Sequence, residues 1–312
     1  MYFPKGVIGM TDFNNSNMKK KIKVNMHLTE KCNYHCRYCF AHFEEHMKLK
    51  KEDWMKIIDN CADSGSVYEI NFAGGEPMLL PYLHELAEYV NKKGMSCSLI
   101  TNGSMLTEEW IKKYAGLFRT IGISVDSFSA ETARETGRCT CRGEVQSAER
   151  TADSIRKIKY WHPEVKIKMN TVVNRLNRNE IPAIFMESEN LRIDRWKLLK
   201  MAYFNDGSHN NAELAVTDDE YNNFVKNNLR VFGVSDISDD KVRYETECGT
   251  EVVAEKEIKG GYYMIDAGGY LVDDTYNDSY TRVINCLTEP LNEGIDKLTL
   301  YEDVYYSRYK AV

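Results

Sequence analysis

The chain has 312 residues, 43% of them hydrophobic, and a formal net charge of −6. A chain of this length can bury one large core, so we expect a single α/β barrel rather than two small domains. The acidic balance argues against broad nucleic-acid binding, which depends on many Lys and Arg contacts to phosphates. A small anionic ligand remains compatible with the sequence where basic side chains converge.

The sequence contains no run of ~20 apolar residues that would span a membrane, and Met1–Lys21 has no apolar signal region. Nine cysteines, an odd number, in a chain of this length indicate free thiols and metal ligands more than a disulfide scaffold. We therefore expect a cytoplasmic protein with reduced cysteines that does not bind a membrane.

From Ile22 onward, apolar runs of strand length alternate with segments of helical period. This pattern is typical of βα units around a parallel sheet. The predicted strands are Ile22–Leu28, Val67–Ala73, Met95–Thr101, Thr120–Val125, Val165–Val173 and Trp196–Ala202. The predicted helices are Lys51–Asp63, Leu80–Lys92, Thr107–Phe118, Glu144–Trp161 and Glu180–Asn190, with Thr107 as a helix cap. Six such units predict a partial (β/α)6 TIM-like barrel over residues 22–204.

The regular alternation ends after residue 204. Residues 1–21 are interpreted as an N-terminal extension, and residues 205–312 as a C-terminal extension that completes or covers the active site. Within it, Thr217–Phe232 has a helical pattern, and Tyr262–Ile265 resembles a short strand that enters a glycine turn. The charged stretch Ser235–Lys259 has no readable structure.

Three cysteines follow the first predicted strand with the spacing Cys-x3-Cys-x2-Cys: Cys32, Cys36 and Cys39. Three thiolates can hold three irons of a [4Fe–4S] cluster and leave the fourth iron open to another ligand. Two alternatives stay open at this point. The thiols are unrelated, or they form a structural zinc site, for which a fourth ligand is available from His27, His35 or His42.

Further motifs end the next three predicted strands. Gly74-Gly75-Glu76-Pro77 follows the second strand, Asn102 follows the third, and Ser124 lies on the fourth. Barrel enzymes place their sites at the carboxyl ends of the strands, and glycines let the backbone approach a ligand closely. These motifs therefore belong to the same expected site as the cysteines.

Together the motifs resemble the radical S-adenosylmethionine (SAM) superfamily. The resemblance implies that SAM chelates the open iron and that an electron from the cluster cleaves SAM to a 5′-deoxyadenosyl radical. It places the segment Gly74, Gly75 and Glu76 at the amino group of SAM, with Asn102 also in the SAM site. Phe40 would pack near the adenine.

Longer segments resemble the viperin family over roughly Ile22 to Lys197. They include Val24-Asn-Met-His-Leu-Thr-Glu-Lys-Cys-Asn-Tyr-His-Cys36, Ile123-Ser-Val-Asp-Ser-Phe128, Thr136-Gly-Arg138 and Lys166-Ile-Lys-Met-Asn-Thr-Val-Val173. Viperins remove water from a nucleoside triphosphate such as CTP, UTP or GTP to give the 3′-deoxy-3′,4′-didehydro nucleotide, which terminates viral polymerases. The resemblance implies an antiviral lyase of this type.

The resemblance also assigns residues. Arg138, Lys168 and Lys197 match triphosphate-binding positions, while Asn25 and Asn170 match polar substrate contacts. Lys168 and Asn170, two apart on a strand, are expected to point to the same face. Arg195 matches a contact of the SAM carboxylate, Ser124 a contact of its ribose, and Tyr262 the proposed donor of a hydrogen to the substrate radical.

The chain also departs from the family. Glu69 stands where viperins carry a further triphosphate lysine; it could pair with a lysine, contact a base amine, or face outward while Arg282 supplies the cation. The membrane helix and the C-terminal tryptophan of animal viperins are absent from this sequence, which is the pattern expected of a prokaryotic member. The lone Cys248 and Cys286 argue against relatives with C-terminal cysteine clusters.

The partners expected are a nucleoside triphosphate and an electron donor such as flavodoxin or ferredoxin, with the protein acting as a monomer. Two alternatives remain. One is a radical SAM enzyme that acts on another small metabolite or peptide. The other is a non-catalytic Fe–S or zinc protein. SAM cleavage separates the enzymes from the binding protein, and dependence of that cleavage on nucleotide separates the two enzymes.

Overall fold

The structure is a computed structural model that describes residues 21–40, 49–203, 210–238, 241–256, 260–274, 280–300 and 305. The expected N-terminal extension, apart from its last residue, lies outside the described residues, as does most of the C-terminal tail. Within the described part, no helix is long and apolar enough to cross a membrane.

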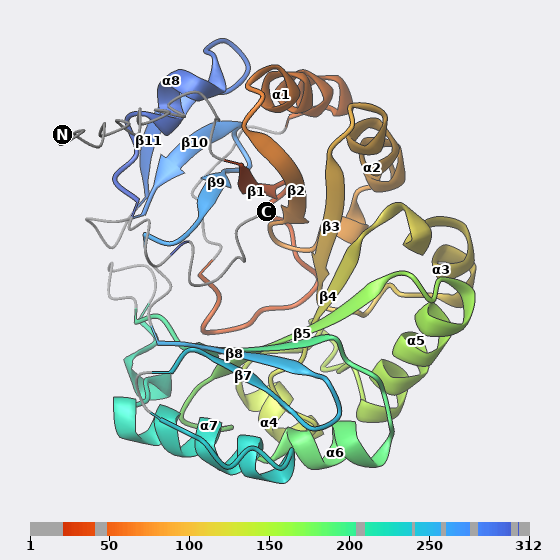
Figure 1. Cartoon of the computed structure of the whole chain (residues 1–312), viewed down its shortest axis with the longest axis vertical. Coiled ribbons are helices and arrows are strands. Elements are labelled where there is room, and N and C mark those ends of the chain that lie inside the picture. Colours follow the sequence, from red (N-terminus) through yellow and green to blue (C-terminus); the bar gives the residue numbers. More distant parts are fainter. Residues whose placement is uncertain are drawn as a thin grey trace, which may run out of the picture.

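The strands form one curved sheet in the order β11-β10-β9-β1-β2-β3-β4-β5-β6-β8-β7. Adjacent strands are parallel from β9 through β8, and β10, β11 and β7 pair antiparallel at the two edges. The strands are β1 Ile22–His27, β2 Val67–Ala73, β3 Ser96–Thr101, β4 Thr120–Ser124, β5 Lys166–Val173, β6 Arg195–Lys200, β7 Arg243–Glu245, β8 Glu251–Glu255, β9 Tyr263–Ile265, β10 Tyr270–Asp273 and β11 Thr281–Asn285. Figure 1 shows their arc, whose two edge strands are β11 and β7.

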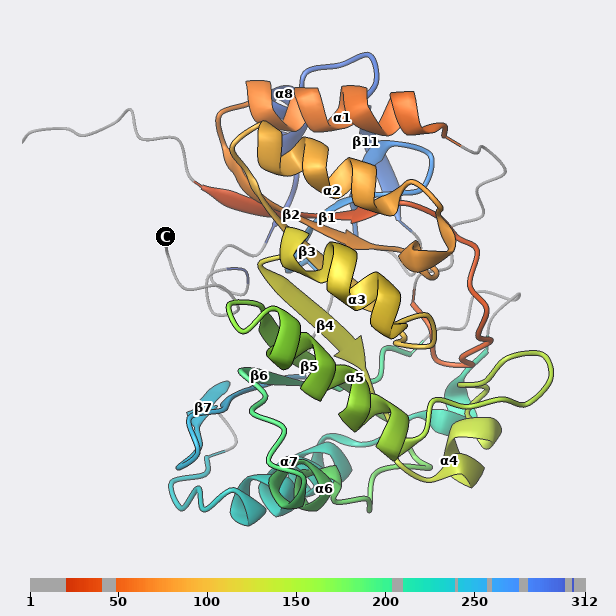
Figure 2. The ribbon, with the colours of Figure 1, turned by 90° about the vertical axis from the view of Figure 1, so that its right-hand side faces the viewer.

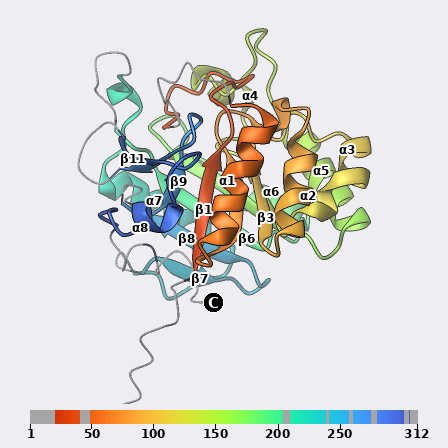
Figure 3. The same ribbon diagram turned by 90° about the horizontal axis from the view of Figure 1, so that it is seen from above.

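Helices cover the outer face of this arc (Figures 1 and 2). Seen from above, α1, α2, α3 and α5 stand outside the parallel strands (Figure 3). The α-helices are α1 Lys51–Asp63, α2 Leu83–Lys92, α3 Glu108–Tyr114, α4 Ala130–Glu135, α5 Ala148–Trp161, α6 Pro182–Ser188, α7 Asp218–Val231 and α8 Leu291–Ile295. Short 3₁₀ turns span Pro77–Leu79, Ala115–Leu117 and Ala212–Leu214.

The two faces of each strand have different tasks, as β5 illustrates. Ile167 and Met169 are fully buried in the hydrophobic core between the sheet and its helices. Since side chains alternate along a strand, Lys168 and Asn170 point to the concave side of the arc. The inside of the barrel is therefore polar, whereas the layer between the sheet and the surrounding helices is apolar.

Most predicted elements are confirmed. All six predicted strands exist with ends shifted by at most two residues, Lys51–Asp63 is helical over its predicted length, and Thr107 caps α3 by accepting a hydrogen bond from Trp110 N. The partial barrel is confirmed as well. Sequence reasoning missed the short helix α4, and the stretch without readable structure contains β7 and β8.

The strands contributed by the C-terminal extension lengthen the arc at both ends. β8 pairs with β6, and β9 pairs with β1, in both cases in parallel. Cys61 and Cys97 are buried, as expected for small core residues, and Cys139 and Cys141 are free thiols.

The start of α7 offers a test of the fold. Thr217 accepts a hydrogen bond from Glu220 N at 3.2 Å, and the Glu220 carboxylate accepts one from Thr217 N at 2.9 Å. Thr217→Ala should lower the free energy of unfolding by about 1 kcal/mol, because a helix-terminal N–H loses its partner. Thr217→Ser keeps the oxygen and should match the parent in chemical denaturation followed by circular dichroism. Equal loss in both variants would contradict the capping role.

Candidate active site

The cysteines and the glycine motif meet at the carboxyl ends of the parallel strands. The segment with Cys32, Cys36 and Cys39 follows β1, and Gly74 and Gly75 follow β2. Gly75 N donates to Thr29 O at 2.6 Å, and a Cβ on Gly75 would lie 2.3 Å from Lys31 O. Only glycine lets the two segments approach so closely.

Glu76 ties this contact to the third strand. Its side chain is fully buried and accepts hydrogen bonds from Met78 N, Thr101 Oγ1 and Asn102 N at 3.0, 2.8 and 2.7 Å. Burial raises the pKa of Glu76, and the hydrogen bonds act in the opposite direction. The Asn102 amide in turn reaches toward Cys32 Sγ at 3.9 Å. One carboxylate therefore holds the glycine motif and the cysteine loop in a common frame.

Arg138 lies at the same end of the barrel. Its guanidinium pairs with Asp126 Oδ2 at 3.0 Å, donates to the carbonyl of Ser124, and approaches Cys36 Sγ at 3.9 Å. Tyr38 donates its hydroxyl proton to the same Asp126 oxygen at 2.6 Å. Burial raises the pKa of the Cys36 thiol to about 12, against the opposing effect of Arg138. The sequence reasoning did not single out Asp126 as a site residue, although it lies in the quoted motif around Ser124.

The donor set fits a [4Fe–4S] cluster bound by three thiolates. Cys32, Cys36 and Cys39 are free thiols on one short loop, with the N–H groups of Asn102 and Arg138 directed at two of them. Among the described residues, no group of three or more His, Cys, Asp or Glu side chains is arranged to hold a single metal ion. His42, one ligand of the zinc alternative, lies outside the described residues.

Phe40 and His27 lie where the cysteine loop meets β1. Their rings contact edge to face with centroids 6.1 Å apart, and Phe40 O accepts the Tyr280 hydroxyl at 3.0 Å. His27 is buried, and burial lowers its pKa to about 4, so the imidazole is neutral at pH 7. An apolar ring and a neutral imidazole therefore stand at the predicted adenine position.

Strand register places the interior residues on two levels. Ser124, Asn170 and Lys197 are neighbours on β4, β5 and β6. Two residues closer to the strand starts, the next level contains Lys168 and Arg195. At about 3.3 Å per residue, the levels lie roughly 7 Å apart. The residues assigned to SAM ribose and to substrate are thus contiguous along the barrel axis.

Two buried amide oxygens in this interior point to a ligand. Asn170 Oδ1 and Asn71 Oδ1 have no hydrogen-bond partner among the described residues. The Asn71 amide donates to Asn25 Oδ1 at 2.8 Å. Buried polar groups are almost always hydrogen bonded, so a bound polar molecule is the natural partner for these oxygens. Asn71 joins Asn25 and Asn170 as a candidate contact that the sequence reasoning did not assign.

A buried carboxylate links Lys197 to Tyr262. Lys197 Nζ lies 2.6 Å from Glu255 Oε1 and donates to the Tyr262 hydroxyl, which donates to Glu255 Oε2 at 2.8 Å. Lys197 and Glu255 are 7% and 4% exposed. The sequence reasoning placed Glu255 in the stretch without readable structure and missed it.

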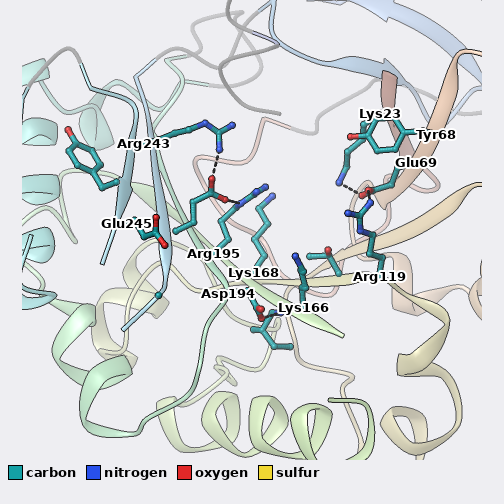
Figure 4. A pocket seen from close by; sticks show the side chains of 15 residues that line it. Lys23, Tyr68, Glu69, Arg119, Lys166, Lys168, Asp194, Arg195, Arg243 and Glu245 are labelled. Carbon is teal, nitrogen blue, oxygen red and sulfur yellow. Dashed lines mark hydrogen bonds and ion pairs between the residues drawn. The ribbon is translucent and has the colours of Figure 1, made fainter. Parts of the chain in front are cut away.

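A cavity of about 660 Å³ lies at the amino ends of the strands. Six basic and four acidic side chains line it. The basic ones are Lys23, Arg119, Lys166, Lys168, Arg195 and Arg243. Figure 4 shows Lys168 and Arg195 side by side in it. Burial, and then the charges of Lys197, Lys23 and Arg195, hold the pKa of Lys168 well below its usual value. This electrostatic setting favours an anion.

Glu69 forms an ion pair with Lys23 on the neighbouring strand (Figure 4). It also accepts a hydrogen bond from the hydroxyl of Ser98. Arg119 approaches its other oxygen at 3.6 Å. Burial opposes ionisation of Glu69, but these cations and hydrogen bonds outweigh it and lower the pKa. Arg282 instead pairs with Asp266 at 3.0 Å and does not line the cavity. Of the alternatives for Glu69, the structure contains the pair with a lysine.

The two assigned arginines lie at opposite ends of the barrel. Arg138 contacts the cysteine end, whereas Arg195 is the first residue of β6, lines the cavity and pairs with Glu251 at 2.5 Å. The structure does not bring Arg195 to Glu76 and the cysteines, although it was expected at the SAM carboxylate. Lys23 could have been found from its spacing, since it precedes Asn25 and His27 by two and four residues on one strand face.

The close backbone contact at Gly75 yields a test. Gly75→Ala places a Cβ against Lys31 O and should cost about 1–3 kcal/mol of stability through overpacking, with a displaced Cys32 and reduced iron binding. The control is Gly143→Ala, which has open space around its Cβ and a φ of 75°. It should cost about 1 kcal/mol yet leave iron binding intact after anaerobic reconstitution. Full iron binding by Gly75→Ala would contradict this reading of the glycine.

Comparisons with known proteins agree with this geometry. The model of the radical SAM superfamily matches residues 26–185. A protein of Selenomonas ruminantium, named S-adenosylmethionine-dependent nucleotide dehydratase, is 36% identical over 289 residues, which cover 92% of this chain and 98% of that protein. A protein of the same name from Lacinutrix mariniflava is 31% identical over 94% of this chain, which spans 60% of that longer protein.

Solved structures support the fold. The enzyme anSMEcpe with bound AdoMet and a peptide matches with a TM-score of 0.65 at 15% identity, over 91% of this chain and 82% of that one. SuiB of Streptococcus suis matches with a TM-score of 0.64 at 14% identity, over 92% and 67%. At such identities these matches concern the fold alone. With the cysteine loop, the Gly-Gly-Glu frame and the full-length relative, they lead to one conclusion: the chain belongs to the radical SAM superfamily and, within it, to the family of S-adenosylmethionine-dependent nucleotide dehydratases.

Proposed function

We propose that this protein removes water from a nucleoside triphosphate, CTP, UTP or GTP, to form the 3′-deoxy-3′,4′-didehydro nucleotide in antiviral defence. The observation that carries the proposal is the polar barrel interior, which runs from the cysteine loop past Asn170 and Lys197 to the cavity around Lys168. A nucleotide has matching ends, an uncharged sugar and base and an anionic phosphate chain.

The thiolates of Cys32, Cys36 and Cys39 would hold the [4Fe–4S] cluster. With SAM bound, the cluster supplies the electron that yields a 5′-deoxyadenosyl radical. The Gly74–Glu76 segment, Asn102, Ser124 and Phe40 would surround SAM. The positions of the two arginines support an exchange of their expected roles, because Arg138 lies next to the cysteines and is suited to the carboxylate of SAM.

At the other end, Arg195, Lys168 and Lys23 would bind the phosphate chain. Charge-assisted hydrogen bonds in a partly dehydrated cavity are stronger than those in water, and they fix the position of the chain. The cation that viperins place on β2 would come from β1 here, as Lys23, with Glu69 as its partner. Asn25, Asn71 and Asn170 would bind polar atoms of the nucleotide at the level between both ends.

Tyr262 would give up its phenolic hydrogen after the hydroxyl has left, as one electron to the substrate and one proton released from the phenol. Its phenol contains a removable hydrogen and lies beside Lys197 at the level of Asn170. The reductant would be a one-electron donor such as flavodoxin or ferredoxin, in the cytoplasm, with the protein acting as a monomer.

The function is tested by anaerobic incubation with SAM, dithionite and each of CTP, UTP, GTP and ATP, followed by mass spectrometry. We expect about four irons per chain after reconstitution, 5′-deoxyadenosine, and a nucleotide product lighter by one water. Cys36→Ala should lose both iron and SAM cleavage, because a cluster ligand is missing. SAM cleavage that no nucleotide stimulates would favour the alternative of a radical SAM enzyme that acts on another small metabolite or peptide. Bound zinc without iron would leave only the alternative of a non-catalytic zinc-binding protein.

The low pKa of Lys168 predicts that the protein takes up a proton when it binds a nucleotide. Its pKa is depressed in the free protein, and a phosphate would raise it, so the complex binds more protons. Affinity should rise as the pH falls through the interval between the two pKa values. Calorimetry in two buffers of different ionisation enthalpy measures this uptake.

Lys168→Ala should abolish the uptake and weaken binding by about 1.5–3 kcal/mol, the range of a charged hydrogen bond. The control is Lys113→Ala on the exposed face of α3, where the lysine pairs only with Glu109 among the described residues, and it should bind like the parent. Equal binding heats in both buffers for the parent would contradict the assignment of Lys168.

A further inference from the structure

Glu255 connects three segments that are distant in the sequence. It ends β8, it lies 2.6 Å from Lys197 on β6, and it accepts the hydroxyl of Tyr262 just before β9 at 2.8 Å. Since β9 lies toward the β11 edge of the sheet and β8 next to the β7 edge, this contact connects the two end regions of the arc (Figure 1). Glu255 itself is buried and has no role in the function as proposed so far.

We propose that Glu255 is the proton acceptor for Tyr262: when the phenol gives one electron to the substrate, its proton moves to the Glu255 carboxylate. This inference rests on the proposed function and adds to it the residue that makes the phenol a usable donor of an electron.

The direction of the hydrogen bonds supports the assignment. Lys197 donates to the Tyr262 oxygen, so that oxygen acts as an acceptor toward Lys197 and directs its own single proton to Glu255 Oε2. A distance of 2.8 Å is within the range over which protons transfer directly. Lys197 simultaneously contacts the other oxygen of Glu255 at 2.6 Å, which holds the carboxylate with Oε2 directed at the phenol.

The energetics point the same way. Removing an electron from a phenol that keeps its proton creates a positive charge on the ring, inside the barrel. An additional buried charge is costly unless it is neutralised. Transfer of the proton to Glu255 leaves a neutral phenoxyl group, so the electron can leave without that penalty.

The step balances in atoms and charge. The ribose radical loses its 3′ oxygen as hydroxide, which takes a proton from the Lys197–Glu255 pair and leaves as water. The remaining sugar cation radical accepts one electron from Tyr262 and becomes the neutral didehydro product. The phenolic proton enters the pair in exchange for the one it gave. Tyr262 is restored by a proton from solvent and one electron from the donor that reduces the cluster.

The alternative is that Glu255 acts only as a counter-ion that neutralises Lys197. The two roles predict different measurements. A counter-ion affects nucleotide affinity and stability, and leaves the yield of product per SAM cleaved unchanged. A proton acceptor controls that yield, because SAM cleavage and hydrogen abstraction precede the step it serves.

The experiment compares the ratio of didehydro nucleotide to 5′-deoxyadenosine at saturating nucleotide in the reconstituted holoenzyme. Glu255→Gln should form 5′-deoxyadenosine with at least a several-fold lower ratio, as should Tyr262→Phe, and Glu255→Asp should recover part of the ratio. The matched control is Glu251→Gln on the same strand, whose carboxylate pairs with Arg195 and Arg243. It should alter nucleotide affinity and keep the parent ratio.

A parent ratio in Glu255→Gln would overturn the proposal, as would an equal fall in Glu251→Gln. If Glu255→Gln does not fold, Glu255→Asp carries the same test, because it keeps the charge opposite Lys197 and shortens the reach to Tyr262. A ratio below that of the parent is expected, and a parent ratio in Glu255→Asp would then overturn the proposal. A parent enzyme that cleaves SAM but dehydrates no nucleotide contradicts the proposed function, and the inference falls with it. A parent that makes product while Glu255→Gln does so in the same ratio contradicts the inference alone.

Discussion

The interior of this barrel depends on the pairing of buried and half-buried cations with carboxylates from neighbouring strands. Lys197 pairs with Glu255, Arg195 with Glu251, and Lys23 with Glu69. An isolated ammonium or guanidinium inside a protein would cost several kcal/mol, so these carboxylates allow a row of cations to be held in place before any ligand binds. Under the proposed function, an entering phosphate chain would meet side chains that are already oriented and would exchange contacts with the carboxylates.

This pairing also explains how the departure at Glu69 is tolerated. A carboxylate at a phosphate site would repel the substrate if it acted alone, but the adjacent Lys23 and the nearby Arg119 neutralise it. Lys23 lies on the strand next to Glu69, and the cavity keeps its excess of basic side chains. Because β1 and β2 are parallel neighbours in register, a lysine on either strand can reach the same part of the cavity.

At the cysteine end of the barrel, buried carboxylates also hold neighbouring side chains in place, and there they direct N–H groups at the cysteine sulfurs. Asp126 holds Arg138 beside Cys36, and Glu76 holds Asn102 beside Cys32. Both carboxylates act through a second side chain that presents an N–H group to a sulfur. N–H groups near cluster sulfurs influence the reduction potential, so these buried acids belong to the environment of the cluster as much as to the fold.

The sequence by itself determined the βα order, the cysteine loop and the glycine motif, because local spacing and strand alternation are properties of neighbouring residues. It also placed Lys168 and Asn170 on one strand face. Only the tertiary structure decided that Arg138 and Arg195 lie at opposite ends, since both are plausible anion ligands until the fold places the loop of Arg138 beside the cysteines and Arg195 at the start of β6. Glu255 was equally out of reach, because its partners Lys197 and Tyr262 meet it only when the distant strands β6, β8 and β9 fold around one interior.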